Sequence, residues 1–358
     1  MSQHAPLAPS AAEQWFNCPG SVSMIKSMPP IVEDEAAAEE GTLAHAVAYA
    51  NVMGMTTPAG ATEEMLDGAE LWADTMLAYP AQHHFETHVG IHSIHAQCEG
   101  TLDGRTWDPT TNTLTIGDYK FGHRYVEVFE CRQMLLYAFG VVENHPEIKP
   151  MHIEFVIVQP RSYHRDGPVR RWAITRAEFE AYRQIFRDAA ALAMSPDAPT
   201  VTGSHCRDCK ARRACPTLQE ASYQIVEWAG KNLPFNMPPR ALGKELQLMT
   251  EAQALLSSRI SGLTDEVMGR VKSGESVPGW MLESSAGRER WSKPLEEVLL
   301  MGQMMGVDIS KPSAVTPKQA IKAGLAAELV HMYSETPNGA SKLVADTGAK
   351  SRSAFRSK

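Results

Sequence analysis

The chain has 358 residues, of which 43% are hydrophobic and 21% are charged, and its formal net charge is −8. These proportions are typical of a folded globular protein and exclude a fibrous or low-complexity chain. The sequence contains no run of about 18 apolar residues, so we expect no membrane-spanning helix.

The charge and the first residues narrow the class of protein further. A negative net charge argues against nucleic-acid binding by bulk charge, although a local basic groove can still bind phosphates. Basic residues cluster in 161–172 and 206–215, and a solvated surface is the alternative interpretation of both clusters. The start of the chain lacks the basic and apolar segments of a secretory signal. We therefore expect a cytoplasmic protein whose six cysteines are metal ligands or buried thiols.

The first third of the chain changes from loop-like to helical to strand-like composition. Residues 1–30 are rich in Pro and Ser around the segment QWFNCPGS. Helices are expected over 33–53 and over 63–79, the second ending at a proline. The alternating, β-branched stretch 84–107 predicts one or two strands, and Asp, Pro and Asn in 108–112 predict a turn. A strand is expected over 113–120.

The middle of the chain alternates helices and strands. Its periodicity predicts a helix over 128–145, an apolar strand over 151–160, a strand over 169–175 and a helix over 176–194. This order favours an α/β architecture with a mixed central sheet flanked by helices.

The composition changes again near residue 220, where we place a boundary between a domain of 1–220 and a mainly helical extension of 221–358. The extension begins with a long helix over 240–274. A short β-like stretch over 279–287, further helical segments and a basic tail over 348–358 follow. The extension could cap the domain, clamp a ligand or self-associate.

The stretch EGTLDGRTWDPTTNTLTIGDYK, residues 99–120, predicts a hairpin with two acids on one face. A hairpin centred near residues 110 and 111 pairs residues whose numbers sum to about 221, which places Asp103 opposite Asp118. Directly opposed side chains lie about 4.5–5.5 Å apart, and Lys120 points to the same face. Two opposed carboxylates are destabilising unless a cation neutralises them, and oxygen ligands suit Mg²⁺ or Mn²⁺.

A solvated surface hairpin is the alternative, because a one-residue shift of register would separate the two acids. Other residues favour a site. The helix 33–53 carries Glu40 and His45, and a histidine can complete a metal shell, although a single helical histidine is usually structural. The helix 128–145 places Gln133 and Tyr137 on one face, where both can donate to phosphate oxygens. Ordinary packing is the alternative for both, more so for Tyr137.

Four segments, in chain order, resemble the motifs of RecB-like PD-(D/E)XK nucleases. GTLAH, GTLD, GDYK and QMLLY match G-x-x-x-H, G-x-x-D, D-x-K and Q-x-x-x-Y. Each segment is weak alone, whereas the ordered set is specific and covers about residues 13–217. The resemblance implies a restriction-endonuclease-like fold and metal-dependent hydrolysis of DNA phosphodiesters by a metal-activated water.

The resemblance also implies roles for individual residues, with Glu40 as a neighbour of the site. Lys120 would be the catalytic lysine, able to orient or help deprotonate a metal-bound water. Gln133 and Tyr137 would contact DNA. The implied metal ligands are His45, Asp103, Asp118 and the Tyr119 carbonyl.

A second group of ligands is predicted in HCRDCKARRACP, where Cys206, Cys209 and Cys215 have the spacing C-x2-C-x5-C. Three clustered cysteines need a fourth ligand, and Cys18 is the candidate. This pattern resembles the iron–sulfur subset of RecB-like nucleases, including the CRISPR-associated and AddB-type enzymes. That resemblance implies a [4Fe–4S] cluster that joins the ends of the domain. Zinc, held by the three cysteines with His205 or Cys18, is the alternative.

Cys98 and Cys131 lie inside a predicted strand and helix, where we expect buried thiols. The segments PGWMLESSAGRERW and SKLVADTGAKSRSAF resemble, more loosely, the tail of a RecB-like nuclease family of phages and prophages. We therefore expect a DNA nuclease, an exonuclease by its relatives, that serves phage recombination or replication in the host cytoplasm.

Two alternatives remain open. One is a structure-selective endonuclease, and the other is a DNA- or partner-binding protein with a vestigial site. The expected partners are single- or double-stranded DNA ends, a single-strand-binding or annealing protein, and a second copy of the chain, with no membrane.

Overall fold

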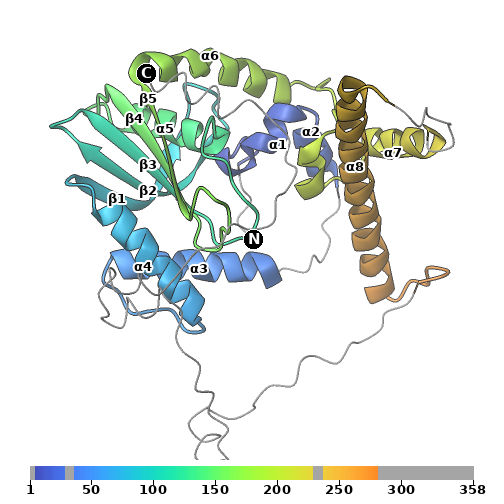
Figure 1. The fold of residues 1–358 in the computed structure, drawn as a ribbon, viewed down its shortest axis with the longest axis horizontal. Helices are drawn as coiled ribbons and strands as arrows, with labels where there is room; N and C mark the ends of the chain where they lie inside the picture. Colours follow the sequence, from blue (N-terminus) through green and yellow to red (C-terminus); the bar gives the residue numbers. More distant parts are fainter. Residues whose placement is uncertain (1–4, 29–35, 229–236, 281–358) are drawn as a thin grey trace, which may run out of the picture. The chain divides into compact units, whose positions relative to one another are not determined.

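Five strands form one mixed sheet that lies between two layers of helices (Figure 1). The computed structural model describes residues 5–28, 36–228 and 237–280, which belong to one compact unit. The strands cross the sheet in chain order and are β1 (Gln82–Gly90), β2 (Glu99–Asp108), β3 (Thr113–Tyr119), β4 (His152–Val158) and β5 (Val169–Thr175). The predicted α/β class, with a mixed sheet flanked by helices, is confirmed.

Only one pair of neighbouring strands is parallel. β3 and β4 run in the same direction, and the other three pairs are antiparallel. A parallel pair needs a long crossover connection, which α5 (Arg132–Asn144) supplies. The carboxyl ends of β3 and β4 therefore lie at the same edge of the sheet.

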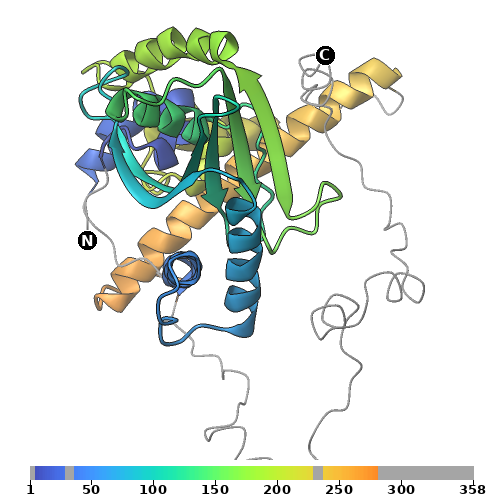
Figure 2. The same ribbon diagram turned by 90° about the vertical axis from the view of Figure 1, so that its left-hand side faces the viewer.

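Helices cover both faces of the sheet. In Figure 2, α3 and α4 lie beside each other on the opposite side of the molecule from α6. The larger core lies between the sheet, α5 and α6, and a smaller core lies under α3 and α4. The bounds of these helices are α3 (Ala36–Val52), α4 (Glu63–Leu77) and α6 (Arg176–Ala193).

Close packing of Trp72 of α4 against the sheet explains why two positions in the hairpin of β2 and β3 are glycine. A Cβ atom on Gly104 or on Gly117 would lie 2.8 Å from the Trp72 ring, closer than real contacts allow. The two glycines are directly paired across the strands. They let the helix approach the sheet next to the motif residues of both strands.

The two ends of the described chain meet at a group of helices that also contacts α5 and α6. These are the 3₁₀ helices η1 (Pro9–Ala11) and η2 (Ser204–Asp208) and the helices α1 (Ala12–Asn17), α2 (Ser21–Ser27), α7 (Pro216–Trp228) and α8 (Pro239–Lys272). The boundary that we predicted near residue 220 falls within α7. None of the helices in the described residues is both long enough and apolar enough to cross a membrane.

Most of the expected elements are confirmed within a few residues. Beyond residue 194, η2 and α7 were not predicted, and two further differences lie earlier in the chain. α5 begins four residues later than predicted, because Glu130 has a positive φ of 55° that a helix excludes and Cys131 is the N-cap. The Pro- and Ser-rich start of the chain contains η1, α1 and α2, which its composition did not predict. Most of the β-like stretch 279–287 and the tail 348–358 lie outside the described residues.

Candidate metal and nuclease site

The register of β2 and β3 is the one that the sequence predicts. The paired residues run from Gly104 opposite Gly117 to Asp108 opposite Thr113. One step further would pair Asp103 with Asp118, but the ladder ends there. Instead, Asp103 Oδ2 accepts a hydrogen bond of 2.7 Å from the backbone N–H of Tyr119. The Asp103 carboxylate thus accepts the N–H that a backbone carbonyl would accept in a regular ladder. This hydrogen bond fixes the position of the carboxylate relative to the sheet.

A third acid lies at the same level of the sheet. β1 and β2 pair Phe85 with Gly104 and Thr87 with Leu102, and their register places Glu86 across from Asp103. Glu86 has a positive φ of 48°, which residues with a side chain rarely adopt. Three adjacent strands therefore carry an acid at one level, where both ladders are interrupted.

The interruption of the ladders also changes the faces of the sheet to which the side chains of β2 point. Leu102 and Trp107 pack in the same core although they are five residues apart. In a regular strand, residues an odd number apart point to opposite faces. The alternation is therefore broken between them, as β-bulges do next to functional sites. The break occurs where Asp103 leaves the ladder.

His45 of α3 completes a group of potential metal ligands. Its Nδ1 lies 3.5 Å from Asp103 Oδ1, and one ligand atom from each of His45, Glu86 and Asp103 lies within 4.8 Å of the others. Burial raises the pKa of Glu86, and the nearby charge of Asp103 raises it further. Glu86 is exposed to solvent, whereas His45 and Asp103 are partly buried. Two carboxylates and an imidazole held this close fit a divalent cation such as Mg²⁺ or Mn²⁺.

Asp118 lies beside this group but is held by other partners. Its Oδ1 accepts hydrogen bonds from Lys120 Nζ at 3.0 Å and from Gln133 Nε2 at 2.9 Å. Gln133 Oε1 accepts a second bond from the same Nζ at 3.2 Å. The three side chains thus form a closed triangle, and the predicted role of Asp118 as a metal ligand stays a prediction.

Electrostatics favour a charged Lys120. Burial opposes its charge, but Asp118 and Asp103 outweigh that effect and raise the pKa of the ammonium group. Burial raises the pKa of Asp118 as well, with Asp103 adding to it and Lys120 opposing it. We conclude that the proton stays on the lysine at neutral pH, so that Lys120 is a donor to negative charge.

Tyr137 and Tyr119 have packing roles. Tyr137 lies in the larger core, is 5% exposed and shares a hydrogen bond with Gln133. It therefore braces the glutamine that holds Lys120. The Tyr119 ring packs edge-on against His45, with ring centroids 5.4 Å apart. Contact of Gln133 and Tyr137 with DNA, and ligation by the Tyr119 carbonyl, stay predictions.

Glu40 belongs to a different cluster. It accepts two hydrogen bonds from Arg161, whose Nη2 also donates to Glu64 at 2.8 Å. The Arg161 guanidinium lies 3.8 Å from the centroid of the Phe121 ring. Glu40 therefore joins α3 to α4 and to the loop after β4, next to the site.

Glu86 was not predicted from the sequence. No motif surrounds it, and its position depends on the register of β1 against β2, which the connection over 91–98 does not reveal. The alternation of the segment HFETHVG predicts a strand that contains Glu86. It does not predict that Glu86 lies beside His45, because a regular strand would not place it there.

The four predicted cysteine ligands line one small pocket. Cys18 ends α1, Cys206 lies in η2, and Cys209 and Cys215 follow it. The backbone N–H of Val201 donates to Cys18 Sγ at 3.3 Å, and that of Gly203 donates to Cys206 Sγ at 3.4 Å. Burial raises the pKa of the Cys209 thiol to about 11.

The structure also shows the positions of His205, the alternative fourth ligand, and of the two remaining cysteines. His205 Nε2 lies 2.8 Å from the Val201 carbonyl oxygen, and His205 is absent from the pocket lining within the described residues. Cys98 is fully buried, as predicted, and Cys131 is partly buried against the larger core. The pocket thus supplies four thiols from the two ends of the domain.

A comparison with known protein families gives one match. The model of a family described as "Protein of unknown function (DUF2800)" matches residues 4–350. The match includes both the acidic group on the sheet and the four cysteines. The description states no activity, so the function must be argued from these residues.

Proposed function

The chain belongs to the DUF2800 family, and we propose that it is a Mg²⁺- or Mn²⁺-dependent DNA nuclease with a restriction-endonuclease-like PD-(D/E)XK core. One observation carries the proposal. The acids of three adjacent strands, Glu86, Asp103 and Asp118, meet His45 on one side and Lys120 on the other. Hydrolysis of a phosphodiester needs both an activated water and stabilised charge on the phosphate, and such a set supports both.

The roles of the residues follow from their contacts. His45, Glu86 and Asp103 would hold the cation, which when bound lowers the pKa of water and stabilises charge on the phosphate. Lys120 donates to the phosphate oxygens on which negative charge develops. Asp118 and Gln133 hold its ammonium group in place through bonds of 3.0 and 3.2 Å.

The direction of cleavage and the biological setting rest on the resemblance to RecB-like nucleases. We propose an exonuclease that acts on DNA ends in phage recombination or replication, in the host cytoplasm, with a single-strand-binding or annealing protein as a partner. A structure-selective endonuclease is the alternative within the same chemistry. A binding protein with a vestigial site is the alternative of a different class.

End-labelled linear DNA and circular DNA, single- and double-stranded, would be incubated with Mg²⁺ or Mn²⁺ beside the Asp103→Ala variant. We expect degradation of linear DNA only, lost in the variant while DNA binding is kept. Asp74→Ala, which removes an exposed acid of α4, is the control and should cleave normally. Cleavage of circles would show an endonuclease, and cleavage by pure Asp103→Ala protein would contradict the site.

We also propose that Cys18, Cys206, Cys209 and Cys215 hold a [4Fe–4S] cluster. Four thiols meet in one pocket, and backbone N–H groups donate to two of the sulfurs, as at sites where such bonds tune a cluster. Protein purified without oxygen should be brown and contain iron and acid-labile sulfide. A colourless protein that contains zinc would contradict the cluster and favour a structural zinc site.

A further inference from the structure

Two loops at the edge of the site carry exposed aromatic and basic side chains. They follow β3 and β4, whose carboxyl ends lie at the same edge of the sheet, where ligands of α/β proteins bind. The first loop begins with Lys120, whose backbone N–H donates to the Val158 carbonyl at 2.9 Å. The second loop begins directly after Val158. Both loops therefore start at the proposed catalytic lysine.

Tyr163, in the second loop, is 90% exposed. Its ring is parallel to that of His123 in the first loop, with ring centroids 6.5 Å apart and planes 9° apart. The neighbouring Tyr125 packs against His164 at 4.2 Å and lies 4.7 Å from the Arg170 guanidinium. The inner rings thus support the loops, and Tyr163 presents a flat aromatic face to solvent.

We propose that Tyr163 and His123 form a stacking surface for the bases of single-stranded DNA beside the cleavage site. This inference rests on the proposed nuclease function and gives it a substrate class. Bases of a single strand have free faces that stack on aromatic rings, whereas the bases of a duplex are already stacked on each other. The surface would therefore favour single strands over duplexes.

The distance to Lys120 suits this role. His123 is three residues after Lys120, so the two lie within about 10 Å even if the chain is extended. A base on the stacking surface would then flank the phosphate at the site.

The charge of the loops suits a nucleic acid as well. Arg165 is largely exposed beside Tyr163 and can meet the DNA backbone, and its carboxylate neighbour is Asp166, 3.8 Å away. Arg161 is already paired with Glu40 and Glu64, so it holds the loop rather than the ligand.

The test is a binding measurement that needs no cleavage. Fluorescein-labelled oligo(dT) and a labelled duplex would be titrated with the full chain in EDTA, and anisotropy would give the two dissociation constants. We expect Tyr163→Ala to weaken single-strand binding about 5- to 100-fold and to leave duplex binding unchanged. Tyr163→Phe should bind normally, because the ring remains.

Tyr223→Ala is the matched control, since Tyr223 is also exposed but lies on α7. It should bind both DNAs as the unmodified protein does. Equal losses for single strands and duplex in Tyr163→Ala, or no loss at all, would overturn the stacking surface. Selective loss in a protein that never cleaves DNA would keep the surface and reject the nuclease function. Normal cleavage with unchanged binding in Tyr163→Ala would reject the stacking surface and keep the nuclease function.

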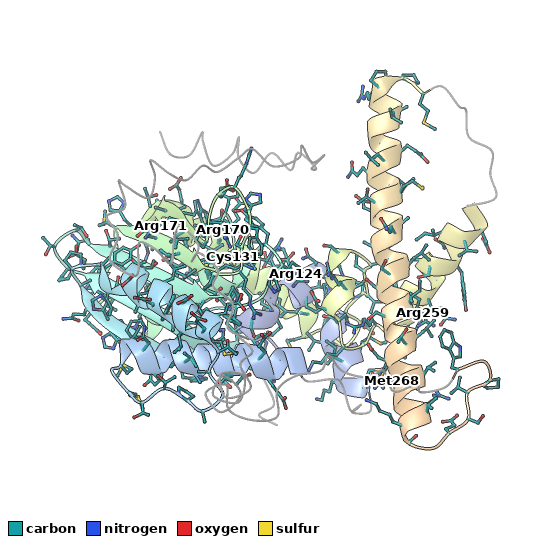
Figure 3. All side chains as sticks on the ribbon, turned by 60° about the horizontal axis from the view of Figure 1, so that its bottom comes forward. Arg124, Cys131, Arg170, Arg171, Arg259 and Met268 are labelled. Carbon is teal, nitrogen blue, oxygen red and sulfur yellow. The ribbon has the colours of Figure 1, made fainter. Side chains whose placement is uncertain are left out.

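A separate observation concerns α8, which has 34 residues. One side of it packs on the cysteine segment. A Cβ atom on Gly262 would lie 2.7 Å from the backbone N of Arg213, and Arg259 donates to the Arg213 carbonyl at 2.7 Å. Arg259 is labelled in Figure 3, where α8 extends well beyond α7.

A different side of α8 carries an apolar stripe with heptad spacing. Steps of four and three residues connect its members through three heptads. Most of them are exposed, while Leu256 and Val267 are partly buried. The positions equivalent to d are Leu242, Met249, Leu256 and Leu263, and those equivalent to a are Leu246, Gln253, Ile260 and Val267.

From this stripe we infer that α8 forms a parallel two-stranded coiled coil with a second copy of the chain. Leu at three of the four d positions, with Ile260 and Val267 at a, is the pattern that favours two parallel strands. A single polar residue at a, here Gln253, fixes register and the number of strands at some loss of stability. This inference does not depend on the nuclease function.

Sedimentation velocity of the full chain gives the test. We expect a dimer for the unmodified protein and a monomer for the double variant Ile260→Asp, Leu263→Asp. Leu248→Asp is the control, because Leu248 is exposed on α8 but outside the stripe, and it should stay dimeric.

A monomeric unmodified protein, or a double variant that stays dimeric, would overturn the coiled coil. Gln253→Leu gives a second test that does not depend on a disruptive change. It should raise the melting temperature of the dimer, and a fall would contradict the assigned stripe.

Discussion

The acidic group on the sheet and the cysteine pocket are the two proposed metal sites, and they differ in what holds their side chains in place. Glu86, Asp103 and Asp118 are placed by the register of neighbouring strands. Cys18 and Cys206 come from opposite ends of the domain and meet through packing of short helices. Burial and the nearby charge of Asp103 raise the pKa of Glu86, whereas burial raises the pKa of the Cys18 and Cys206 thiols.

Because of this difference, the two regions should contribute differently to the stability of the fold. Without a cation, carboxylates held close together oppose folding, so the rest of the sheet must hold them there. The cysteine pocket instead joins two ends of the chain, so a metal bound there contributes its binding free energy to folding. We therefore expect removal of a metal-site carboxylate and removal of a cysteine ligand to have opposite effects on stability.

The largest effect is expected for Cys209→Ser. Loss of one ligand should release the bound metal and lower the free energy of unfolding by on the order of 5 kcal/mol, because structural metal binding is coupled to folding. Urea unfolding of anaerobic protein measures this effect. Cys98→Ala, which changes a buried cysteine outside the pocket, is the control. Equal stability of the Cys209→Ser and Cys98→Ala variants would contradict a structural role of the pocket.

The next largest effect is expected at the ion pair between the buried Asp118 and Lys120, whose side chain is 28% exposed. Lys120→Met leaves the 2% exposed Asp118 without its cation and should lower stability by about 3–5 kcal/mol. The double variant with Asp118→Asn should recover most of this loss, because it removes the uncompensated charge. Neither variant should cleave DNA. A double variant as unstable as the single one would show that packing of Lys120, and not its charge, matters.

Glu86→Gln should have a smaller effect and the opposite sign. Burial, followed by Asp103, raises the pKa of Glu86 above its ordinary value of 4.5. A carboxyl group with a raised pKa in the folded state lowers stability above that pKa, and the loss disappears below the unfolded value. In EDTA, Glu86→Gln should therefore melt at a higher temperature than the unmodified protein at pH 7, and the gap should close towards pH 4.5.

The same variant should bind the proposed divalent cation more weakly, by about 10- to 100-fold on the scale of ligand-shell changes. Activity titrated with Mn²⁺ measures this loss. Glu99→Gln, an exposed acid at the start of the same strand pair, should change neither the melting temperature nor the metal titration. Lower stability of Glu86→Gln in EDTA would mean that Glu86 is held by favourable contacts and not by strain.

Much of the acidic group could be predicted from the sequence because the turn over 108–112 fixes the register of β2 and β3. The predicted pairing is found from Gly104 to Asp108. It failed at the end that carries Asp103, where the Asp103 carboxylate accepts a hydrogen bond from the Tyr119 backbone N–H and the ladder stops. The rules of regular strands describe the scaffold, and the site is where the strands depart from them.

Side-chain direction was the second limit of prediction. Periodicity places Asp118 and Lys120 on one face, but it cannot show that Gln133 closes a triangle with them. Glu86 was missed because its positive φ depends on tertiary contacts. The three clustered cysteines were easier to group, because their C-x2-C-x5-C spacing is typical of metal ligands, whereas Cys18 is far away in the sequence and was only the candidate for the fourth ligand.

The smallest effect is expected at Arg161, which joins the acidic region to the loops. Hydrogen bonds from Arg161 lower the pKa of Glu40 and of Glu64 below 4.5. Both carboxylates are about half exposed, so solvent screens their interactions with Arg161. Arg161→Met should therefore lower the free energy of unfolding by only about 1 kcal/mol at pH 7.

A depressed carboxyl pKa gives stability above the unfolded value of 4.5 that is lost as pH falls through the folded value. The gap in unfolding free energy between the unmodified protein and Arg161→Met should therefore narrow below pH 4.5. Arg124→Met removes an ion pair with Asp208 in which both side chains are largely exposed, so it should show almost no gap at either pH. An Arg161→Met gap that persists in acid would assign its effect to the contact with the Phe121 ring and not to the carboxylates.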